Sequence, residues 1–239
     1  MKSSRVVADG QFKHMFKVII IGESYVGKSH IFQTFCDAVS RHSSTEEPGV
    51  KEIGPTTSVD LRTRIVMLDE TSVKLHIWDT MGQEKFASMT RAYYRATQGV
   101  LVVFDVTVRE SFSALHRWLV DVSQNCDRRV ACVLVGHKAD QIDQRAVSAE
   151  EAKQFATQCG MMYIETTVKN PQTIEKAFVM LCEKMVTYVD KTRPVPNDLS
   201  FKLPRALLDK GQDPGGGKLD RKSSGYANQS QGKRAKGCC

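Results

Sequence analysis

The segment Gly22-Glu-Ser-Tyr-Val-Gly-Lys-Ser29 decides how the whole chain is interpreted. It fits the pattern G-x-x-x-x-G-K-[ST] and lies between a run that favours β-structure and a segment with helical spacing. Backbone N–H groups of such a loop point at an anion, a lysine adds a point charge, and a hydroxyl is a hard oxygen ligand for Mg²⁺. The sequence therefore predicts a phosphate site in which Lys28 lies between the β- and γ-phosphates and Ser29 binds Mg²⁺.

Runs that favour β-structure alternate with helical segments on both sides of this loop. Six strands are predicted, over residues 16–21, 59–68, 73–78, 100–104, 131–135 and 162–164. The second and third alternate polar and apolar residues and are close enough to form a hairpin, whereas the other four are apolar, as parallel strands covered on both faces are. Helical spacing is found at Phe112, Leu115, Leu119 and Val122, after a capping box of Ser148 and Glu151, and from Ile174 to Val189.

The length of 239 residues and the hydrophobic fraction of 41% suit one globular domain with an appendage. The net charge of +7 lies wholly in residues 191–239, where eleven Lys and Arg face four Asp, so residues 1–190 are formally neutral. Prolines, glycines and serines mark this basic segment as a flexible linker. A neutral domain argues against nucleic-acid binding, whereas a basic segment near a chain end suits an anionic membrane surface.

Composition also bears on the cellular compartment. Apolar runs are far shorter than the roughly 20 residues that cross a bilayer, and residues 1–15 carry no secretory signal, so we expect a cytosolic protein. The seven cysteines lack the spacing of a disulfide framework or a zinc site. We therefore expect buried thiols at residues 36, 126, 132, 159 and 182, and the chain ends in the pair Cys238-Cys239.

A second polar segment, Asp79-Thr-Met-Gly-Gln83, ends the third predicted strand. There the Asp79 carboxylate can bind Mg²⁺, the N–H of Gly82 can reach the γ-phosphate, and Gln83 can orient an attacking water molecule. A hydroxyl from Thr56 or Thr57, in the loop before the second strand, can complete the Mg²⁺ ligands when a γ-phosphate draws that loop inward.

Two further segments follow the fifth and sixth strands and suit a purine base. The Asp140 carboxylate, in Gly136-His-Lys-Ala-Asp140, can accept hydrogen bonds from both N1–H and N2–H₂ of guanine, a pair of donors that adenine lacks. In Glu165-Thr-Thr-Val-Lys169, a backbone N–H near Val168 can reach guanine O6. Guanine is therefore the predicted base.

Taken in this order, the four segments resemble the small GTPases of the Ras superfamily, and within it the Rab family, over residues 14–190. The stretches KLHIW (74–78), KFASMT (85–90), YYR (93–95) and LVVFDVT (101–107) are similar to those that distinguish Rabs, and SVDL (58–61) is a looser match. The Gly-His-Lys triplet at 136–138 and the long loop before the threonines are most similar to the Rab subgroup numbered thirty-nine and forty-two.

The resemblance implies a P-loop NTPase fold, an α/β architecture with a twisted six-stranded sheet and helices on both faces. The sheet would be mostly parallel, with one antiparallel strand and with nucleotide bound across the carboxyl ends of the strands. A small GTPase domain would span residues 14–190, between an N-terminal extension (1–13) and a basic hypervariable tail (191–239).

The resemblance also implies the members of the site. Gln83 and Lys28 would be catalytic, and Mg²⁺ would be held by Ser29, Asp79 and Thr56, with Thr57 as second choice. The nucleotide-binding residues would be Gly22, Ser24, Tyr25, Val26, Gly27, Lys28, Ser29, His30, Thr56, Gly82, His137, Lys138, Asp140, Thr167, Val168 and Lys169.

A switch and its regulators follow from the same resemblance. GTP with Mg²⁺ would order two switch segments that effectors bind, and hydrolysis to GDP would release them. A GTPase-activating protein would supply an arginine to otherwise slow hydrolysis, and a guanine nucleotide exchange factor would reload the site. The protein would be a monomer that acts in vesicle trafficking, with no nucleic-acid partner.

Three positions depart from the family pattern. His137 stands where most relatives have Asn, and its imidazole would hold the base in a different geometry with lower affinity. Because the similar Rab subgroup carries the same His, a tolerated substitution is favoured, and a loop histidine is the alternative. Tyr25 replaces a small residue beside the γ-phosphate, and Met81 replaces the usual Ala before Gly82; both predict slow hydrolysis. Relatives place an aromatic ring against guanine from the loop 36–55, which here contains no Phe or Tyr.

The ending Gly232-Lys-Arg-Ala-Lys-Gly-Cys-Cys239 resembles the Rab terminus that receives two geranylgeranyl groups, at Cys238 and Cys239. Two lipids with a basic run anchor a protein stably. The resemblance implies a Rab escort protein, a GDP dissociation inhibitor, and placement on the cytosolic face of Golgi, endosomal or phagosomal membranes with a soluble cytosolic pool.

Two other function classes use part of the same motifs. A P-loop kinase of small metabolites would explain Lys28 and Ser29, but it needs an arginine-bearing lid and has no use for Gln83 or Asp140. A hydrolysis-deficient module whose partners bind whatever the nucleotide would explain Tyr25 and the other departures. Comparing effector capture by the GTP-analogue and GDP forms separates this module from a switch.

Overall fold

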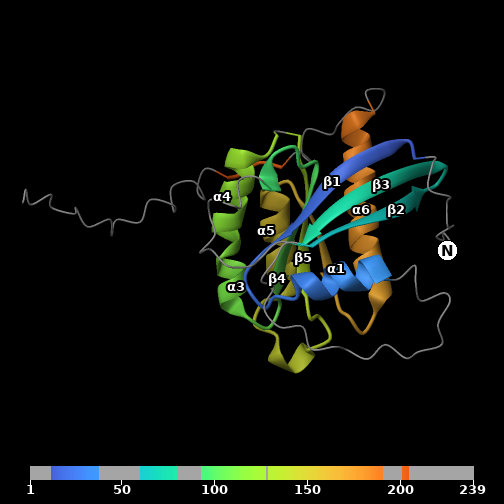
Figure 1. Ribbon diagram of the computed structural model, residues 1–239. Coiled ribbons are helices and arrows are strands. Elements are labelled where there is room, and N and C mark those ends of the chain that lie inside the picture. The colour runs from blue at the N-terminus through green and yellow to red at the C-terminus, as the bar shows by residue number, and fades with distance from the viewer. Residues whose placement is uncertain (1–11, 38–59, 80–92, 128, 191–200, 205–239) are drawn as a thin grey trace, which may run out of the picture.

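The computed structural model of the chain describes residues 12–37, 60–79, 93–127, 129–190 and 201–204 (Figure 1). The strands are β1 (His14–Ile21), β2 (Asp60–Leu68), β3 (Thr71–Asp79), β4 (Gly99–Asp105), β5 (Ala131–His137) and β6 (Met162–Thr166). The helices are α1 (Lys28–Asp37), α3 (Arg109–Ser113), α4 (Leu115–Asn125), α5 (Ala149–Gln158) and α6 (Pro171–Val189), with a 3₁₀ turn, η3 (Ile142–Gln144). All six predicted strands are confirmed.

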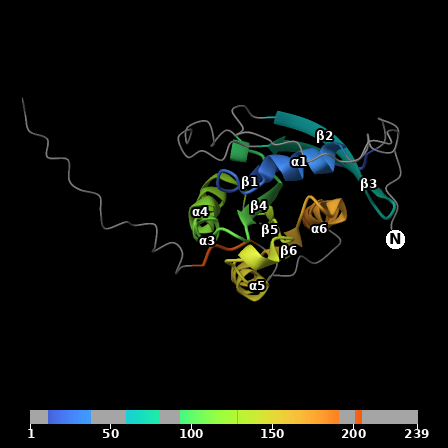
Figure 2. The same cartoon turned by 90° about the horizontal axis from the view of Figure 1, so that it is seen from below.

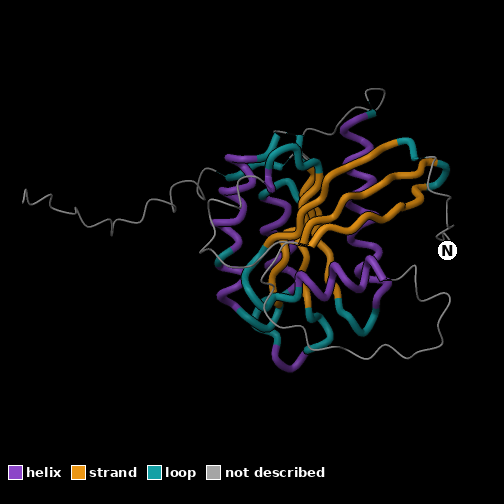
Figure 3. The backbone as a smooth tube through the Cα atoms, in the orientation of Figure 1, coloured by secondary structure: helices purple, strands orange, loops and turns teal. Residues whose placement is uncertain are grey.

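The strands form one sheet in the order β2-β3-β1-β4-β5-β6, which fans through the centre of the molecule (Figure 3). β2 and β3 are the predicted antiparallel hairpin, which turns at Asp69 with φ +50°, and every other neighbouring pair is parallel. Strands are added on one side of β1 and then, from β4 onward, on the other side. Ligands of such sheets bind where the order reverses, at the carboxyl ends of the strands.

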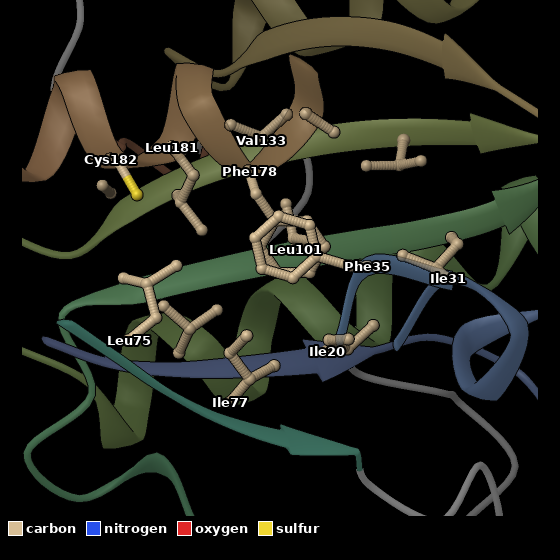
Figure 4. Packing of buried hydrophobic residues seen from close by; sticks show 14 of the residues in the cluster. Ile20, Ile31, Phe35, Leu75, Ile77, Leu101, Val133, Phe178, Leu181 and Cys182 are labelled. Carbon is tan, nitrogen blue, oxygen red and sulfur yellow. The ribbon is translucent and has the colours of Figure 1, made fainter. Parts of the chain in front are cut away.

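Helices cover both faces of the sheet, as expected (Figure 2). α1 and α6 pack on one face, where the rings of Phe35 and Phe178 stack with centroids 3.7 Å apart (Figure 4). α3, α4 and α5 pack on the other face around Leu119, Val122 and Phe104. β1, β4 and β5 are apolar because both of their faces are buried in these two cores.

Four strands extend beyond their apolar runs to a polar residue at the carboxyl edge. The last residues of these strands are Asp79 in β3, Asp105 in β4, His137 in β5 and Thr166 in β6. Each of them is at most 2% exposed. Backbone pairing continues here, with Asp105 opposite His137 and His137 opposite Thr166. The sheet therefore holds a row of buried polar side chains at the edge where a ligand is expected.

Other local expectations need correction. Phe112 lies in α3, while Leu115, Leu119 and Val122 lie in α4, with a break at Ala114. β6 is only half-buried, because it is an edge strand.

The capping box at α5 forms only in part. The Ser148 hydroxyl accepts from the Glu151 N–H at 3.1 Å, as predicted. The Glu151 carboxylate, however, accepts two hydrogen bonds from Arg109 at 2.6 Å instead of returning to the cap. A cross-element partner thus replaces the local one.

The five internal cysteines are free thiols, of which Cys132, Cys159 and Cys182 are buried while Cys36 and Cys126 are only partly buried. Within the part of the chain that the structure describes, no helix combines the length and the apolar character needed to span a bilayer. In the segment predicted to be wholly a linker, residues 201–204 are described and two of their side chains pack on the α4/α5 side of the core.

Candidate functional site

The phosphate loop runs from Gly22 to Gly27 between β1 and α1, and glycine is required at both ends. Gly22 has φ +143°, and a Cβ there would lie 2.1 Å from the carbonyl oxygen of Val103 in β4. Gly27 has φ +99°, and a Cβ there would lie 2.4 Å from Cδ2 of His137. The loop is therefore pressed against the ends of β4 and β5, with a backbone path that no other residue follows without strain.

Lys28, the first residue of α1, is folded into this loop and is 5% exposed. Its Nζ donates hydrogen bonds to the carbonyl oxygens of Gly22 at 3.0 Å and Glu23 at 2.7 Å. Burial lowers the pKa of the Lys28 ammonium to about 8, opposed by the negative charges of Asp79 and Glu23. A buried cation of this kind gains stability from an anionic ligand.

Asp79 ends β3 beside this cation and is 2% exposed. Burial raises the pKa of its carboxyl, while a hydrogen bond with the Ser29 side chain and the positive charge of Lys28 act in the opposite direction. Its Oδ1 atom is buried and has no hydrogen-bond partner among the described residues. A carboxylate oxygen, a hydroxyl and a cation thus meet at one point, and the free oxygen fits a hard cation such as Mg²⁺.

A second cluster ties the base side of the site to the phosphate loop. Lys138 has φ +61°, and its Nζ contacts both Asp105 Oδ2 at 2.6 Å and the carbonyl oxygen of Tyr25 at 3.0 Å. Asp105 is itself oriented by Thr107, whose N–H and hydroxyl donate to Oδ1 at 2.8 and 2.7 Å. The alkyl part of Lys138 thereby crosses from β5 to the phosphate loop.

Asp140 lies just beyond β5, with both carboxylate oxygens engaged. Oδ1 accepts from the Thr167 hydroxyl at 2.6 Å, and Oδ2 lies 2.8 Å from Lys169 Nζ. These two partners hold the pKa of the Asp140 carboxyl below its usual value. The Thr167 hydroxyl also accepts from the N–H of Lys169 at 3.1 Å, within the loop after β6. The contacts of Asp140 with Thr167 and Lys169 join this loop to the one after β5.

His137 is not a loop histidine, because it is the last residue of β5 and is 2% exposed. Its Nδ1 lies 2.8 Å from the hydroxyl of Thr166, and its ring covers Gly27. Burial, together with the charges of Lys138 and His30, lowers the pKa of its imidazole to about 4. A neutral His137 therefore bridges β5, β6 and the phosphate loop.

The other predicted site residues that the structure describes lie around the same edge. Tyr25 has φ +64° and a side chain 73% exposed, so its phenol points away from the core. Val26 is buried in the core, so only its backbone faces a ligand. His30 lies in the first turn of α1. Ser24 is part of the loop, and Val168 packs against the α1/α6 core.

Several predicted residues lie outside the described residues. They are Thr56 and its alternative Thr57, Met81, Gly82, Gln83, and the terminal pair Cys238 and Cys239, together with residues 38–55 of the loop that contains no Phe or Tyr. Among the described residues, the structure brings together the phosphate loop, Asp79 and the two loops after β5 and β6.

Sequence reasoning missed Glu23 as a residue that positions the loop. Its Oε1 accepts a hydrogen bond from the indole N–H of Trp118 at 2.7 Å and also pairs with the guanidinium of Arg117. These partners lie in α4, about 95 positions along the chain. The available sequence signal for this contact is the adjacent pair Arg117-Trp118 in a helix that is otherwise apolar on one face.

The Arg145–Glu165 pair was missed as well. The two Nη atoms of Arg145 donate to the Glu165 carboxylate at 2.8 Å, and the Tyr163 hydroxyl donates to the same carboxylate at 2.8 Å. Glu165 lies in β6, two residues before Thr167. An acid near the end of a short strand and an arginine in the segment between η3 and α5 are the available signals.

The chain matches the family model described as the Ras family over residues 17–187. It is 37% identical to "Ras-related protein RABA4b" of Arabidopsis thaliana over 185 residues, which cover 77% of this chain and 78% of that protein. It is 35% identical to "Ras-related protein Rab11A" of Lotus japonicus over 185 residues, which cover 77% of each chain. With the sheet order and the phosphate loop described above, this chain belongs to the Rab branch of the Ras family of small GTPases, whose members bind GTP and GDP with Mg²⁺ and hydrolyse GTP.

Proposed function

We propose that this protein is a membrane-anchored molecular switch of vesicle trafficking that alternates between GTP- and GDP-bound forms. Residues 14–190 are the switch domain, residues 1–13 an extension, and residues 191–239 the tail that carries the lipids. The observation that carries the proposal is the buried meeting point of Lys28, Ser29 and Asp79 at the edge of the sheet. Such a cluster suits a phosphate chain with its Mg²⁺ ion.

The roles of the nucleotide-site residues follow from this cluster. The backbone of residues 22–27 wraps the phosphates, Lys28 adds its charge, and Ser29, Asp79 and Thr56 or Thr57 hold Mg²⁺ when it is bound. Gln83 positions the attacking water and Gly82 donates its N–H to the γ-phosphate. His30 and Ser24 line the phosphate side.

The base is read by the loops after β5 and β6. Asp140 accepts from N1–H and N2–H₂ of guanine, which requires its Oδ2 to share or release Lys169. The Lys138 side chain lies along the base, and the N–H of Val168 donates to O6. Thr167 orients Asp140 by its hydrogen bond of 2.6 Å. His137, neutral at physiological pH, holds the phosphate loop against β5 and faces the base.

Hydrolysis is proposed to be slow, because the exposed Tyr25 stands beside the phosphate site, where its phenol crowds the γ-phosphate or an arginine that enters from an activating protein. Met81, which precedes Gly82 and Gln83, is proposed to stiffen the switch segment that contains these residues. The Tyr25→Gly change tests this idea in single-turnover GTP hydrolysis. The hydrolysis rate of Tyr25→Gly should exceed that of the unaltered protein when the activating protein is present. If the unaltered protein already hydrolyses GTP as fast as ordinary Rab proteins and Tyr25→Gly leaves the rate unchanged, the idea is wrong.

The proposed partners are those of a lipidated switch: an exchange factor, a GTPase-activating protein, an escort protein, a GDP dissociation inhibitor and effectors that read the switch segments. Geranylgeranyl groups on Cys238 and Cys239 would anchor it to the cytosolic face of Golgi, endosomal or phagosomal membranes. The relatives found carry Rab11 and RABA4 names, so the likeness to the subgroup numbered thirty-nine and forty-two stays a prediction.

The decisive experiment is mass spectrometry of nucleotide that co-purifies with the protein, with and without chelation of Mg²⁺. We expect GDP or GTP, released on chelation, and no ATP. Asp79→Asn should lose the Mg²⁺ dependence, whereas Asp143→Asn, a change of the exposed η3 aspartate, should retain it. Capture of ATP as readily as GTP would overturn the proposal.

A pull-down with effector proteins separates the switch from the hydrolysis-deficient module. A switch captures effectors in its GTP-analogue form and releases them in its GDP form. Equal capture by both forms would favour the module.

A further inference from the structure

The short segment Phe201–Leu203, with Pro204 after it, lies against the body of the protein although the chain has already left α6. Phe201 and Leu203 are partly buried and pack against the core cluster of the α3/α4/α5 face, whereas Lys202 between them is exposed. The N–H of Lys202 donates to the carbonyl oxygen of Cys159 at 3.1 Å. This alternation of apolar and exposed residues is typical of an extended strand lying on a surface.

The backbone contact is made at the end of α5. Cys159 is the residue that caps the carboxyl end of this helix, where carbonyl oxygens have no partner within the helix. The next residue, Gly160, accepts from the buried Nζ of Lys184 in α6 at 2.9 Å. The carbonyl oxygen of Gly160 thus accepts a hydrogen bond from α6, and that of Cys159 accepts one from the segment 201–204.

The position of this segment is far from the nucleotide site. α5 begins after the base loop that follows β5 and ends where β6 starts, so its last residues lie at the amino ends of the parallel strands. Both ribbon views place residues 201–204 between α4 and α5 (Figures 1 and 2). Residues 201–204 therefore lie on the face of the sheet opposite the one that α6 covers.

We propose that residues 201–204 form a strap that fixes the carboxyl-terminal segment on the α4/α5 face, so that the tail leaves the body at residue 205 and not at the end of α6. Phe201 and Leu203 supply the apolar contact, and the bond from Lys202 to Cys159 sets the register. The strap sits at the edge of the sheet opposite the nucleotide, and so it does not cover the site.

The strap changes the geometry of the proposed lipid anchor, and this consequence rests on the proposed function. A tail that starts at residue 205 has 35 residues before the chain ends, against 49 for a tail that starts at residue 191. The strap also selects the α4/α5 side as the one from which the lipidated end departs.

Hydrogen exchange of the full-length, unlipidated, GDP-loaded protein tests the strap at residue resolution. We expect the Lys202 amide to exchange at least tenfold more slowly than an unstructured peptide of the same sequence. The double change Phe201→Ser with Leu203→Ser should bring it to within twofold of the unstructured rate. Lys202→Gln, which alters only the exposed side chain between them, should keep the protection.

An unprotected Lys202 amide in the unaltered protein, or protection that persists in the double variant, would overturn the proposal. Circular dichroism and bound GDP should be the same in all three proteins, because the changed residues lie outside the nucleotide site. Failure of the proposed switch function would instead appear as absent GDP with the Lys202 protection intact, so the two failures are distinguishable.

Discussion

The ring of His137 lies so close to Gly27 that a Cβ on residue 27 would be 2.4 Å from its Cδ2 atom and 2.9 Å from its Nε2 atom. One residue ends β5 and the other ends the phosphate loop, so this contact joins the base side of the site to the phosphate side. The missing side chain of Gly27 is therefore a requirement of tertiary packing as well as of backbone conformation.

Gly27→Ala should damage the site on both counts. The residue has φ +99°, which alanine adopts only with strain, and its Cβ would displace the His137 ring. We expect GDP affinity to fall by at least about 100-fold and the free energy of unfolding to drop by about 2–4 kcal/mol. Isothermal titration and urea unfolding measure these quantities.

The control for this change is Gly99→Ala at the amino end of β4. A Cβ there would lie 2.7 Å from Sδ of Met185, the far end of a flexible side chain, and Gly99 has no positive φ. This variant should lose some stability but bind GDP normally. Wild-type GDP affinity in Gly27→Ala would contradict the packing described above.

The stability of the GDP-bound protein should depend on His137 at acid pH. The folded pKa of about 4 lies below the unfolded value of 6.5, so the unfolded chain binds more protons between these values. Stability is then fully present above pH 6.5 and is lost as pH falls toward 4, by up to about 3 kcal/mol from this group. Urea unfolding at a series of pH values measures the loss.

His137→Asn provides the comparison, because asparagine does not titrate. The difference in unfolding free energy between the two proteins should be constant above pH 6.5 and should shrink as the pH falls to 4. A difference that is the same at every pH would mean that the imidazole is not buried in its neutral form.

Glu23→Ala should weaken the attachment of the phosphate loop to α4. The change removes the acceptor of the Trp118 indole N–H, which is 6% exposed, and leaves this buried donor without its partner. We expect a loss of about 1–2 kcal/mol in the free energy of unfolding and faster release of GDP. A fluorescent GDP analogue reports the release rate.

The exposed pair Arg109–Glu151 is the matched control for Glu23. Its two hydrogen bonds of 2.6 Å are shorter than the 2.7 Å bond from Trp118, but solvent screens them. Arg109→Ala should therefore change stability far less than Glu23→Ala and leave GDP release unaltered. The reverse order of effects would show that the contact with α4 does not matter.

Asp140→Asn should change the base that the site prefers. Each hydrogen bond from guanine N1–H and N2–H₂ to a carboxylate contributes about 1.5–3 kcal/mol, so GDP affinity should fall by about 10²- to 10⁴-fold. Asparagine can donate its N–H₂ to the oxygen that xanthine carries in place of the guanine amino group. Competition between GDP and xanthosine diphosphate measures the preference.

Lys169→Ala is the control for this change. It removes the cation 2.8 Å from Asp140 Oδ2 but leaves both carboxylate oxygens as acceptors. The base preference should stay with guanine in that variant. An Asp140→Asn protein that still prefers GDP would show that the base is read elsewhere.

Much of the site follows from short segments of sequence. The motif at residues 22–29 predicts the loop because its glycines, lysine and serine act within eight consecutive residues. The apolar runs predict the strands; Asp79 is found because it follows such a run directly, and Asp140 because it lies in the short polar segment after the fifth run. The hairpin of β2 and β3 is equally local, since only two residues separate the strands.

Contacts between distant segments were not predictable in this way. The bond from Trp118 to Glu23, the pairing of Lys138 with Asp105 and the burial of His137 all depend on which strands and helices are neighbours. The packing of residues 201–204 is a further case, because a Pro- and Gly-rich composition indicates a linker whether or not two of its apolar side chains find a surface.

Sequence alone determined the strands, the phosphate loop and the chemical types gathered at the carboxyl ends of the strands, because those depend on hydrogen bonding and periodicity among near neighbours. Tertiary structure decided that His137 is a buried bridge, that Glu23 is tied to α4 and that Phe201 and Leu203 pack on the α4/α5 side of the core. Each of these depends on the distance between segments far apart along the chain, and only the sheet order sets that distance.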